Sequence, residues 1–232
     1  MTSVVLAGES GAVTEIIEIG PVHHVRKRAW AGLDRLANPC TQAGLEVTAL
    51  PYGPIPPDLA TPDVWILSDL PFGAAAEFGI LERIMADVPV RSGLVMIGGA
   101  YSYSGIHALG GWQDPRCAAL LPVAPPPTAD DTERPDGVRL VASEDCPQSL
   151  VSLLHEAPAF FGYNRLEPRA GSRVLSWFDD GAPAIVVSDP GPCRTVAFAS
   201  DLLPHWGAAS VQWGRLPDFL AALCAIAAGA AQ

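Results

Sequence analysis

A short apolar run that leads into a pair of glycines constrains this chain more than any other feature. Residues 94–97 (LVMI) have the character of a buried strand, and Gly98, Gly99 and several hydroxyl residues follow at once. In an open α/β sheet the carboxyl end of a strand delivers such a turn, and the turn carries the working groups. The sequence therefore predicts a parallel sheet with a site around residues 98–105.

The same turn lacks the group that usually works there. A nucleophile elbow holds a Ser or Cys at the centre of a G-x-nucleophile-x-G frame. In the string GGAYS, residues 98–102, that centre is Ala100, which has no attacking atom. The turn has the scaffold of a hydrolase-type site without its usual nucleophile.

Composition limits the class of protein and its partners. The 232 residues are 49% hydrophobic and 17% charged, which suits one large core. The net charge of −11 repels nucleic acid and anionic membranes, so we expect neither as a partner. Five cysteines without a C-x-x-C pair indicate reduced thiols and a cytoplasmic location. No basic region precedes the first apolar run, so no secretory leader is expected.

The order of the expected elements indicates a doubly wound α/β fold. Strands are expected at residues 4–7, 45–50, 64–67, 93–97 and 194–199, and helices at 26–43, 74–86 and 211–228. Residues 13–19 alternate like a short strand. A Pro-rich irregular insertion at about 108–137 precedes short strands at 138–142, 173–178 and 184–188, expected to be antiparallel edge strands. No linker is evident, so residues 1–232 are expected to form a single domain.

Five local strings carry a resemblance to a known family. They are ILSD (66–69), VMIGG (95–99), YSYSG (101–105), FGYNR (161–165) and FASDLLPHWG (198–207). In this order the chain resembles the glutamine amidotransferase-like family, a branch of the class I glutamine amidotransferase superfamily related to trehalose-utilisation-like proteins. The resemblance implies a flavodoxin-like three-layer sandwich with a mostly parallel sheet. It implies no activity, because this branch is named by similarity.

The chain departs from the working enzymes of that superfamily at two positions. Such enzymes use an elbow Cys as nucleophile and a later His-x-Glu pair as base and orienting group. Ala100 stands at the elbow, and His205 is followed by Trp206 and Gly207. Standard glutaminase chemistry is therefore not expected, and no cofactor is expected.

Polar residues that follow predicted strands are expected to meet at one rim of the sheet, where they would bind a small polar molecule. The candidate ligand-binding residues are Glu9, Asp69, Gly99, Ala100, Tyr101, Ser104, Asn164 and Trp206. An alternative is that Asp69 and Asp201 cap the helices that follow them. Residues 160–165 are either a loop over the pocket, with Asn164 or Arg165 pointing in, or a core-packing aromatic pair with a surface turn.

Two functional hypotheses follow. The first is a binding protein for a small polar, sugar-like molecule, by analogy with the trehalose-utilisation relatives. The second is a hydrolase of non-standard type, with Ser102 as nucleophile, His205 as base and Asp201 or Glu9 as orienting group, or with a metal bound beside His205. Against this, the alternative is that Ser102 and Ser104 cap a helix or bond the turn backbone. No paired His or Cys spacing supports a metal, so none is predicted. Segments around Trp112, Trp206 and Trp213 are expected to be exposed, which is compatible with a homo-oligomer.

Overall fold

Five parallel strands form the centre of the main sheet in the computed structural model, which describes residues 1–19, 22–188, 194–204 and 206–229, with the backbone alone for residues 10–31 and 118. The strands are β1 (Ser3–Gly8), β4 (Glu46–Ala49), β5 (Val64–Ser68), β6 (Gly93–Ile97) and β12 (Arg194–Phe198). Their spatial order is β4-β1-β5-β6-β12. Numbered along the chain, this is the 2-1-3-4-5 order of flavodoxin-like folds.

Three antiparallel strands extend one side of the sheet. β11 (Pro183–Val187) pairs with β12, and β10 (Arg173–Phe178) and β8 (Leu140–Ala142) follow outward. The predicted mostly parallel sheet with antiparallel edge strands is therefore confirmed.

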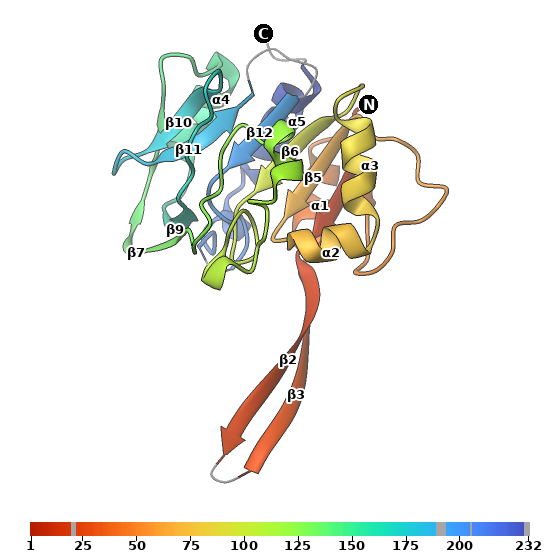
Figure 1. Ribbon diagram of the computed structural model, residues 1–232. Helices are drawn as coiled ribbons and strands as arrows, with labels where there is room; N and C mark the ends of the chain where they lie inside the picture. The colour runs from red at the N-terminus through yellow and green to blue at the C-terminus, as the bar shows by residue number, and fades with distance from the viewer. Residues whose placement is uncertain (20–21, 189–193, 205, 230–232) are drawn as a thin grey trace.

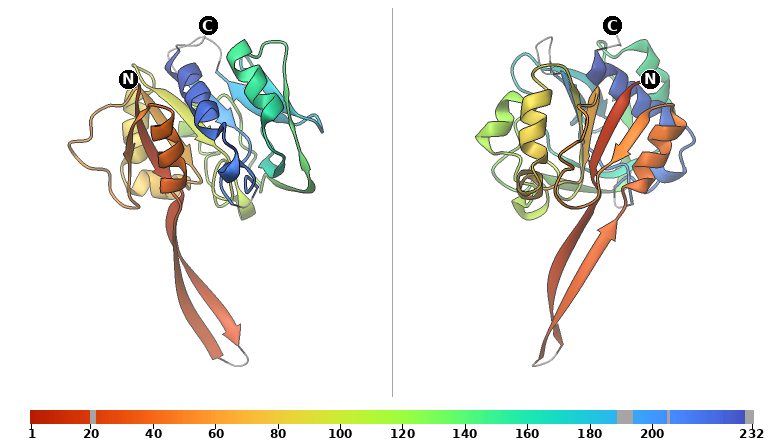
Figure 2. Two further views of the ribbon diagram at one scale, coloured as in Figure 1. Left: turned by 180° about the vertical axis from the view of Figure 1, so that it is seen from behind. Right: turned by 90° about the vertical axis from the view of Figure 1, so that its right-hand side faces the viewer.

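Helices cover both faces of the sheet (Figures 1 and 2). One face carries α1 (Asp34–Gln42), α4 (Gln148–Glu156) and α5 (Leu216–Ala228), and the other carries α2 (Phe72–Glu77) and α3 (Ile80–Asp87). All five residues of β5 and all five of β6 are buried, because strands covered on both faces have no solvent side.

The predicted helix over residues 26–43 is wrong in its first part. Residues Val22–Ala31 form strand β3, which pairs with β2 (Ser10–Ile19), and the helix α1 begins only at Asp34. The spacing of Trp30 and Leu33 fits a helix turn, but local spacing does not reveal pairing with an earlier strand. The predicted helix over 74–86 is divided into α2 and α3 by Gly79, whose φ of 75° interrupts the helical backbone.

The expected irregular insertion at 108–137 is partly regular. It contains the short helix η2 (Pro115–Ala119), and its end lies in β7 (Asp131–Val138), which pairs with β9 (Phe160–Asn164). Residues 160–164 are thus a strand, and the expectation of a loop over the pocket is wrong for them. Two further 3₁₀ turns are η1 (Ile106–Ala108) and η3 (Ser210–Gln212).

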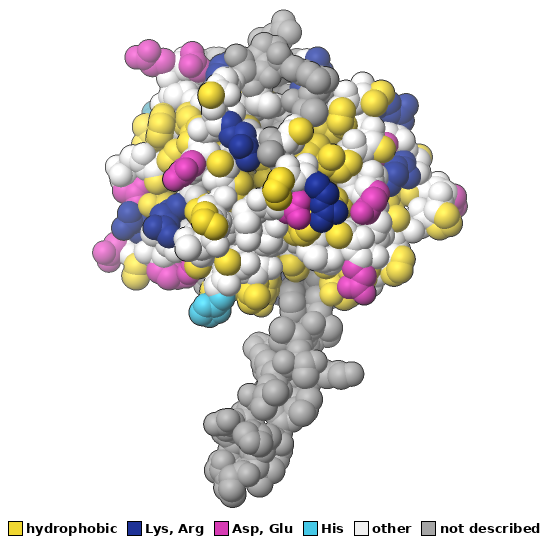
Figure 3. Space-filling model, viewed as in Figure 1, with side chains coloured by type: hydrophobic (Ala, Val, Ile, Leu, Met, Phe, Trp, Pro, Cys, Tyr) yellow, Lys and Arg dark blue, Asp and Glu magenta, His cyan; other side chains and the backbone are white. Residues whose placement is uncertain are grey.

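On the face of the body seen in Figure 3, Arg side chains are spread among acidic and hydrophobic ones. Within the described part of the chain, no helix combines the length and apolar character that crossing a bilayer requires. Trp112 and Trp206 are each only 1% exposed, so the expectation that their segments expose tryptophan is wrong; their indole rings fill the interior.

Candidate functional site

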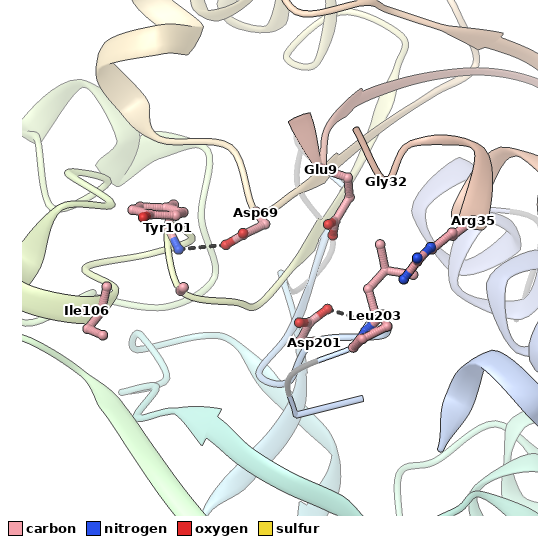
Figure 4. A pocket seen from close by; sticks show the side chains of 10 residues that line it. Glu9, Gly32, Arg35, Asp69, Tyr101, Ile106, Asp201 and Leu203 are labelled. Carbon is pink, nitrogen blue, oxygen red and sulfur yellow. Dashed lines mark hydrogen bonds between the residues drawn. The ribbon is translucent and has the colours of Figure 1, made fainter. Parts of the chain in front are cut away.

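A pocket of about 440 Å³ opens at the carboxyl edge of the parallel strands (Figure 4). Segments that follow β1, β5, β6 and β12 contribute to it, together with the start of α1. The lining residues are Glu9, Gly32, Arg35, Asp69, Ala100, Tyr101, Ile106, Asp201, Leu203 and Pro204. Strand order reverses between β1 and β5, and a crevice at this reversal is the usual ligand site of open α/β sheets.

Two pocket carboxylates sit on unusual backbone. Glu9 has a φ of 49° and Asp69 a φ of 46°, in the left-handed region that side chains other than glycine rarely adopt. The two turns are joined, because the Glu9 N–H donates to the Ser68 carbonyl at 2.8 Å. Strained backbone of this kind at two adjacent strand ends is typical of functional sites.

Burial changes the acidity of two carboxyl groups in the pocket. Glu9 and Asp201 are each 6% exposed. Desolvation by burial, with smaller repulsion from Asp201 and Asp69, raises the pKa of Glu9 well above its usual value. Burial likewise raises the pKa of Asp201 to about 7, although the Leu203 N–H opposes this by donating to Asp201 Oδ1 at 2.7 Å. The pocket can therefore hold or release protons near neutral pH.

Among the described residues, two neighbours offset the negative charge at Glu9. The Ser68 hydroxyl donates to Glu9 Oε1, and the Arg35 guanidinium lowers the pKa of Glu9 electrostatically. Figure 4 shows the Glu9 and Asp201 carboxylates facing the same space, with Arg35 at its side. The site is thus an acidic hollow with the Arg35 cation at its rim.

The turn after β6 does not have the geometry of a working elbow. The Tyr101 N–H, the donor that would follow a nucleophile at position 100, donates to Asp69 Oδ1 at 2.6 Å. In an elbow this N–H belongs to the oxyanion hole. The positive φ, 148°, falls on Gly99 rather than on residue 100. The N–H group that would stabilise a tetrahedral intermediate is therefore already hydrogen-bonded to the Asp69 carboxylate.

Ser102 bonds the backbone of the same turn. Its hydroxyl donates to the Ile97 carbonyl at 2.6 Å and accepts from the Asp69 N–H at 3.1 Å, and the residue is 1% exposed. These bonds fit the turn-bonding alternative. His205 lies outside the described residues, so the pairing of Ser102 with His205 stays a prediction.

Asn164 supports the turn from behind. Its Oδ1 accepts from the Gly99 N–H at 2.9 Å, and its Nδ2 donates to the Gly99 carbonyl at 3.2 Å and to Asp130 Oδ1 at 2.8 Å. Asp130 also accepts from the Ser104 and Gly105 N–H groups. This buried network fixes residues 99–105 against β9.

The structure thus divides the predicted site residues into three groups. Glu9, Asp69, Ala100, Tyr101 and Asp201 line the pocket, whereas Gly99, Ser102 and Asn164 lie in or behind the turn. Two others make contacts elsewhere: the Ser104 hydroxyl donates to the Pro126 carbonyl, and Trp206 Nε1 donates to Glu133 Oε1 at 2.9 Å. A ligand-binding role for any of them stays a prediction.

Sequence reasoning missed five lining residues and the Asp130 support. Gly32 and Arg35 lie within the predicted helix over 26–43, so the sequence did not show that the chain returns to the pocket at these residues after strand β3. Ile106, Leu203 and Pro204 are ordinary apolar residues with no chemical signal. Asp130 sits in an acidic pair behind the Pro-rich stretch, and nothing local connects it to Asn164.

The capping alternative fails for Asp69. The residue before α2 is Pro71, and no side chain caps that helix. Asp201 bonds its own turn through Leu203 rather than a helix end. Among the residues that the structure describes, no group of three or more His, Cys, Asp or Glu side chains is arranged to hold a metal ion.

The fold and the pocket define an α/β protein of the class I glutamine amidotransferase-like type. The chain belongs to the family described as "Putative glutamine amidotransferase", or GATase1-like, whose sequence model matches residues 61–223. None of the curated proteins compared with the chain matches it.

Solved structures repeat the fold over nearly the whole chain. Cytoplasmic protein STM1381 of Salmonella typhimurium LT2 is 25% identical with a TM-score of 0.81, covering 97% of this chain and 98% of that one. Cytoplasmic protein STM3548 of Salmonella typhimurium is 24% identical with a TM-score of 0.80, covering 95% and 96%. A beta-galactosidase of Rahnella sp. R3 is 14% identical with a TM-score of 0.52, over 82% of this chain and 26% of that one, which concerns the fold alone.

Proposed function

We propose that this protein binds a small polar molecule in the pocket at the carboxyl edge and has lost the glutaminase chemistry of the superfamily. One observation supports this proposal above all: the Tyr101 N–H donates to the Asp69 carboxylate, next to Ala100 at the position of the nucleophile. Acyl transfer from glutamine needs both a nucleophile and a free oxyanion donor. The turn offers neither.

The three carboxyl groups of the pocket indicate which chemical class of ligand it favours. Burial raises the pKa values of Glu9 and Asp201, so near neutral pH these carboxyl groups offer O–H donors as well as acceptor oxygens. Together with Asp69 they favour a molecule whose groups both donate and accept hydrogen bonds, as hydroxyls do. Anionic molecules would meet repulsion. A neutral polyhydroxylated, sugar-like compound meets this requirement, and its hydroxyls can also accept from Arg35 at the rim. A volume of about 440 Å³ accommodates a molecule of that size.

The experiment is a thermal-shift and calorimetric screen of sugars, polyols, amines and amino acids. A hit is expected among the hydroxyl-rich compounds, with affinity weakened roughly tenfold or more in Asp69→Ala, since a charged hydrogen-bond partner is lost. Asp58→Asn, an exposed carboxylate that does not line the pocket, is the matched control and should bind as the wild type does. Ammonia release from glutamine by the purified protein would contradict the proposal.

A hydrolase of non-standard type is the second candidate, favoured by the raised pKa values of Glu9 and Asp201. Paired carboxyl groups with different acidities are a common basis of acid–base catalysis near neutral pH. Turnover of a bound sugar derivative, lost in Asp201→Asn, would support it. We also propose that the protein is cytoplasmic and associates with itself. The names of the two Salmonella proteins support the cytoplasmic location.

A further inference from the structure

Strands β2 and β3 form an arm that leads away from the body. They pair in register from Ser10 opposite Ala31 to Ile19 opposite Val22, as a two-stranded sheet separate from the main one. Figures 1 and 2 show the arm projecting from the body in all three views. Ten residues per strand correspond to a length of about 33 Å.

A hairpin of this kind needs a partner. An isolated two-stranded ribbon is marginally stable in water. Residues opposite each other in the ladder share a face, so register places Ile16 and Val25 on one face and Ile19 and Val22 on the other. Both faces of the arm therefore carry β-branched apolar positions, whereas a free-standing ribbon is expected to be polar on at least one face.

Charge identifies a second copy of this chain as that partner. The arm contains Arg26, Lys27 and Arg28, the only run of basic residues in the sequence, against two acidic residues, Glu15 and Glu18. The whole chain has a net charge of −11, so the body without the arm is more acidic still. The arm has three basic and two acidic residues, a net charge of +1, against −12 for the rest of the chain, and Arg26 is opposite Glu15 while Lys27 and Arg28 are opposite Thr14 and Val13. The basic run and an acidic body attract each other between copies, which steers encounter and favours one orientation.

The base of the arm lies at the pocket. The Gly32 N–H donates to the Glu9 carbonyl at 2.6 Å, and both residues line the pocket. The arm begins after Glu9 and ends before Gly32, so a partner that binds the arm would also restrain the backbone of Glu9.

We propose that the β2–β3 arm docks on the body of a second copy, which returns its own arm, so that the protein is a two-fold homodimer. An isologous exchange of this kind closes and leaves no further arm free. The proposal is independent of the pocket's ligand.

The first test is the oligomeric state, measured by light scattering and sedimentation over a wide range of concentration. The wild type is expected to be a dimer, and the triple variant Arg26→Glu, Lys27→Glu, Arg28→Glu is expected to raise the dissociation constant roughly tenfold or more. The control reverses three exposed arginines of the body, at positions 91, 139 and 173, and should remain a dimer. A monomeric wild type, or a triple variant as dimeric as the wild type, overturns the proposal.

The second test uses the fact that Lys27 is the only lysine of the chain. A zero-length carbodiimide joins an amine to a carboxylate that it touches. Equal amounts of unlabelled and ¹⁵N-labelled full-length protein are mixed, diluted below the dissociation constant found in the first test so that subunits exchange, reconcentrated, cross-linked and read by mass spectrometry. Lys27 is expected to be joined to an Asp or Glu of the body in the other label, and Lys27→Arg should keep the dimer without that product. Lys27 links confined to one label overturn the proposal, even where the triple variant misfolds.

Discussion

Asp69 decides what the turn after β6 can do. Its carboxylate occupies the Tyr101 N–H at 2.6 Å, and its own N–H is held by the Ser102 hydroxyl. We therefore predict that Ala100→Cys does not restore glutaminase activity, because a thiol alone supplies neither the oxyanion donor nor the missing His-x-Glu pair. Ammonia release is measured, and alkylation of the introduced thiol verifies that it is reachable. Release above the wild-type level would show that the donor is available after all.

Gly99 is fixed by the same carboxylate. With φ at 148°, an added Cβ would lie 2.6 Å from Asp69 Oδ1. Gly99→Ala is therefore predicted to destabilise the fold by about 2–4 kcal/mol, through backbone strain and crowding together. Gly73→Ala is the control, since a Cβ there meets nothing within 4 Å and the residue is helical. Denaturant unfolding measures both, and equal stability of the two variants would refute the prediction.

At the scale of elements, Asn164 joins strand β9 to the turn after β6. Asn164→Ala removes its three side-chain hydrogen bonds and leaves the Gly99 N–H and the buried Asp130 carboxylate with fewer partners. The expected loss of unfolding free energy is roughly 3–5 kcal/mol, because buried polar groups left without partners are costly. Asn38→Ala, at an exposed position of α1, serves as control. A loss in Asn164→Ala no larger than in the control would mean that β9 does not support the turn.

The elements differ in how far local sequence could predict them. β5 and β6 are short apolar runs ending in polar or glycine residues, and they were predicted within a residue or two because burial on both faces leaves that pattern. β3 was mistaken for a helix because its identity depends on its pairing with β2. For β9 the expectation was either a loop over the pocket or a core-packing aromatic pair with a surface turn. Gly162 and Asn164 are weak strand formers, and the tertiary contacts of Asn164 help to hold the segment as a strand.

At the scale of the whole molecule, the alternation of strands and helices predicted the parallel sheet, and parallel pairing then brought Glu9, Asp69 and Asp201 to one edge. The sequence could not reveal between which two strands the strand order reverses, because the order of strands in the sheet differs from their order along the chain. Nor could it predict the contact of Asp69 with Tyr101, which joins turns 32 residues apart.

The pocket should impose a pH dependence on the stability of the whole fold. The pKa of Asp201 is raised from 3.8 to about 7 in the folded state, so folding takes up a proton between these values. Unfolding free energy is therefore predicted to fall as pH rises from 5 to 8, by about 2–3 kcal/mol from this group. The raised pKa of Glu9 acts in the same direction.

Asp201→Asn isolates this contribution, because the amide keeps an Oδ1 acceptor for the Leu203 N–H but carries no charge. The variant should be more stable than the wild type at pH 8 and nearly equal to it at pH 4, where the wild-type carboxyl is protonated. Its stability should depend less on pH, first because residue 201 no longer titrates. The second reason is that, without the Asp201 charge, repulsion raises the pKa of Glu9 by a smaller amount. Urea unfolding from pH 4 to 8 measures both profiles, with Asp58→Asn as control. A variant that is less stable at pH 8 and keeps the wild-type slope would mean that Asp201 is not the group that titrates.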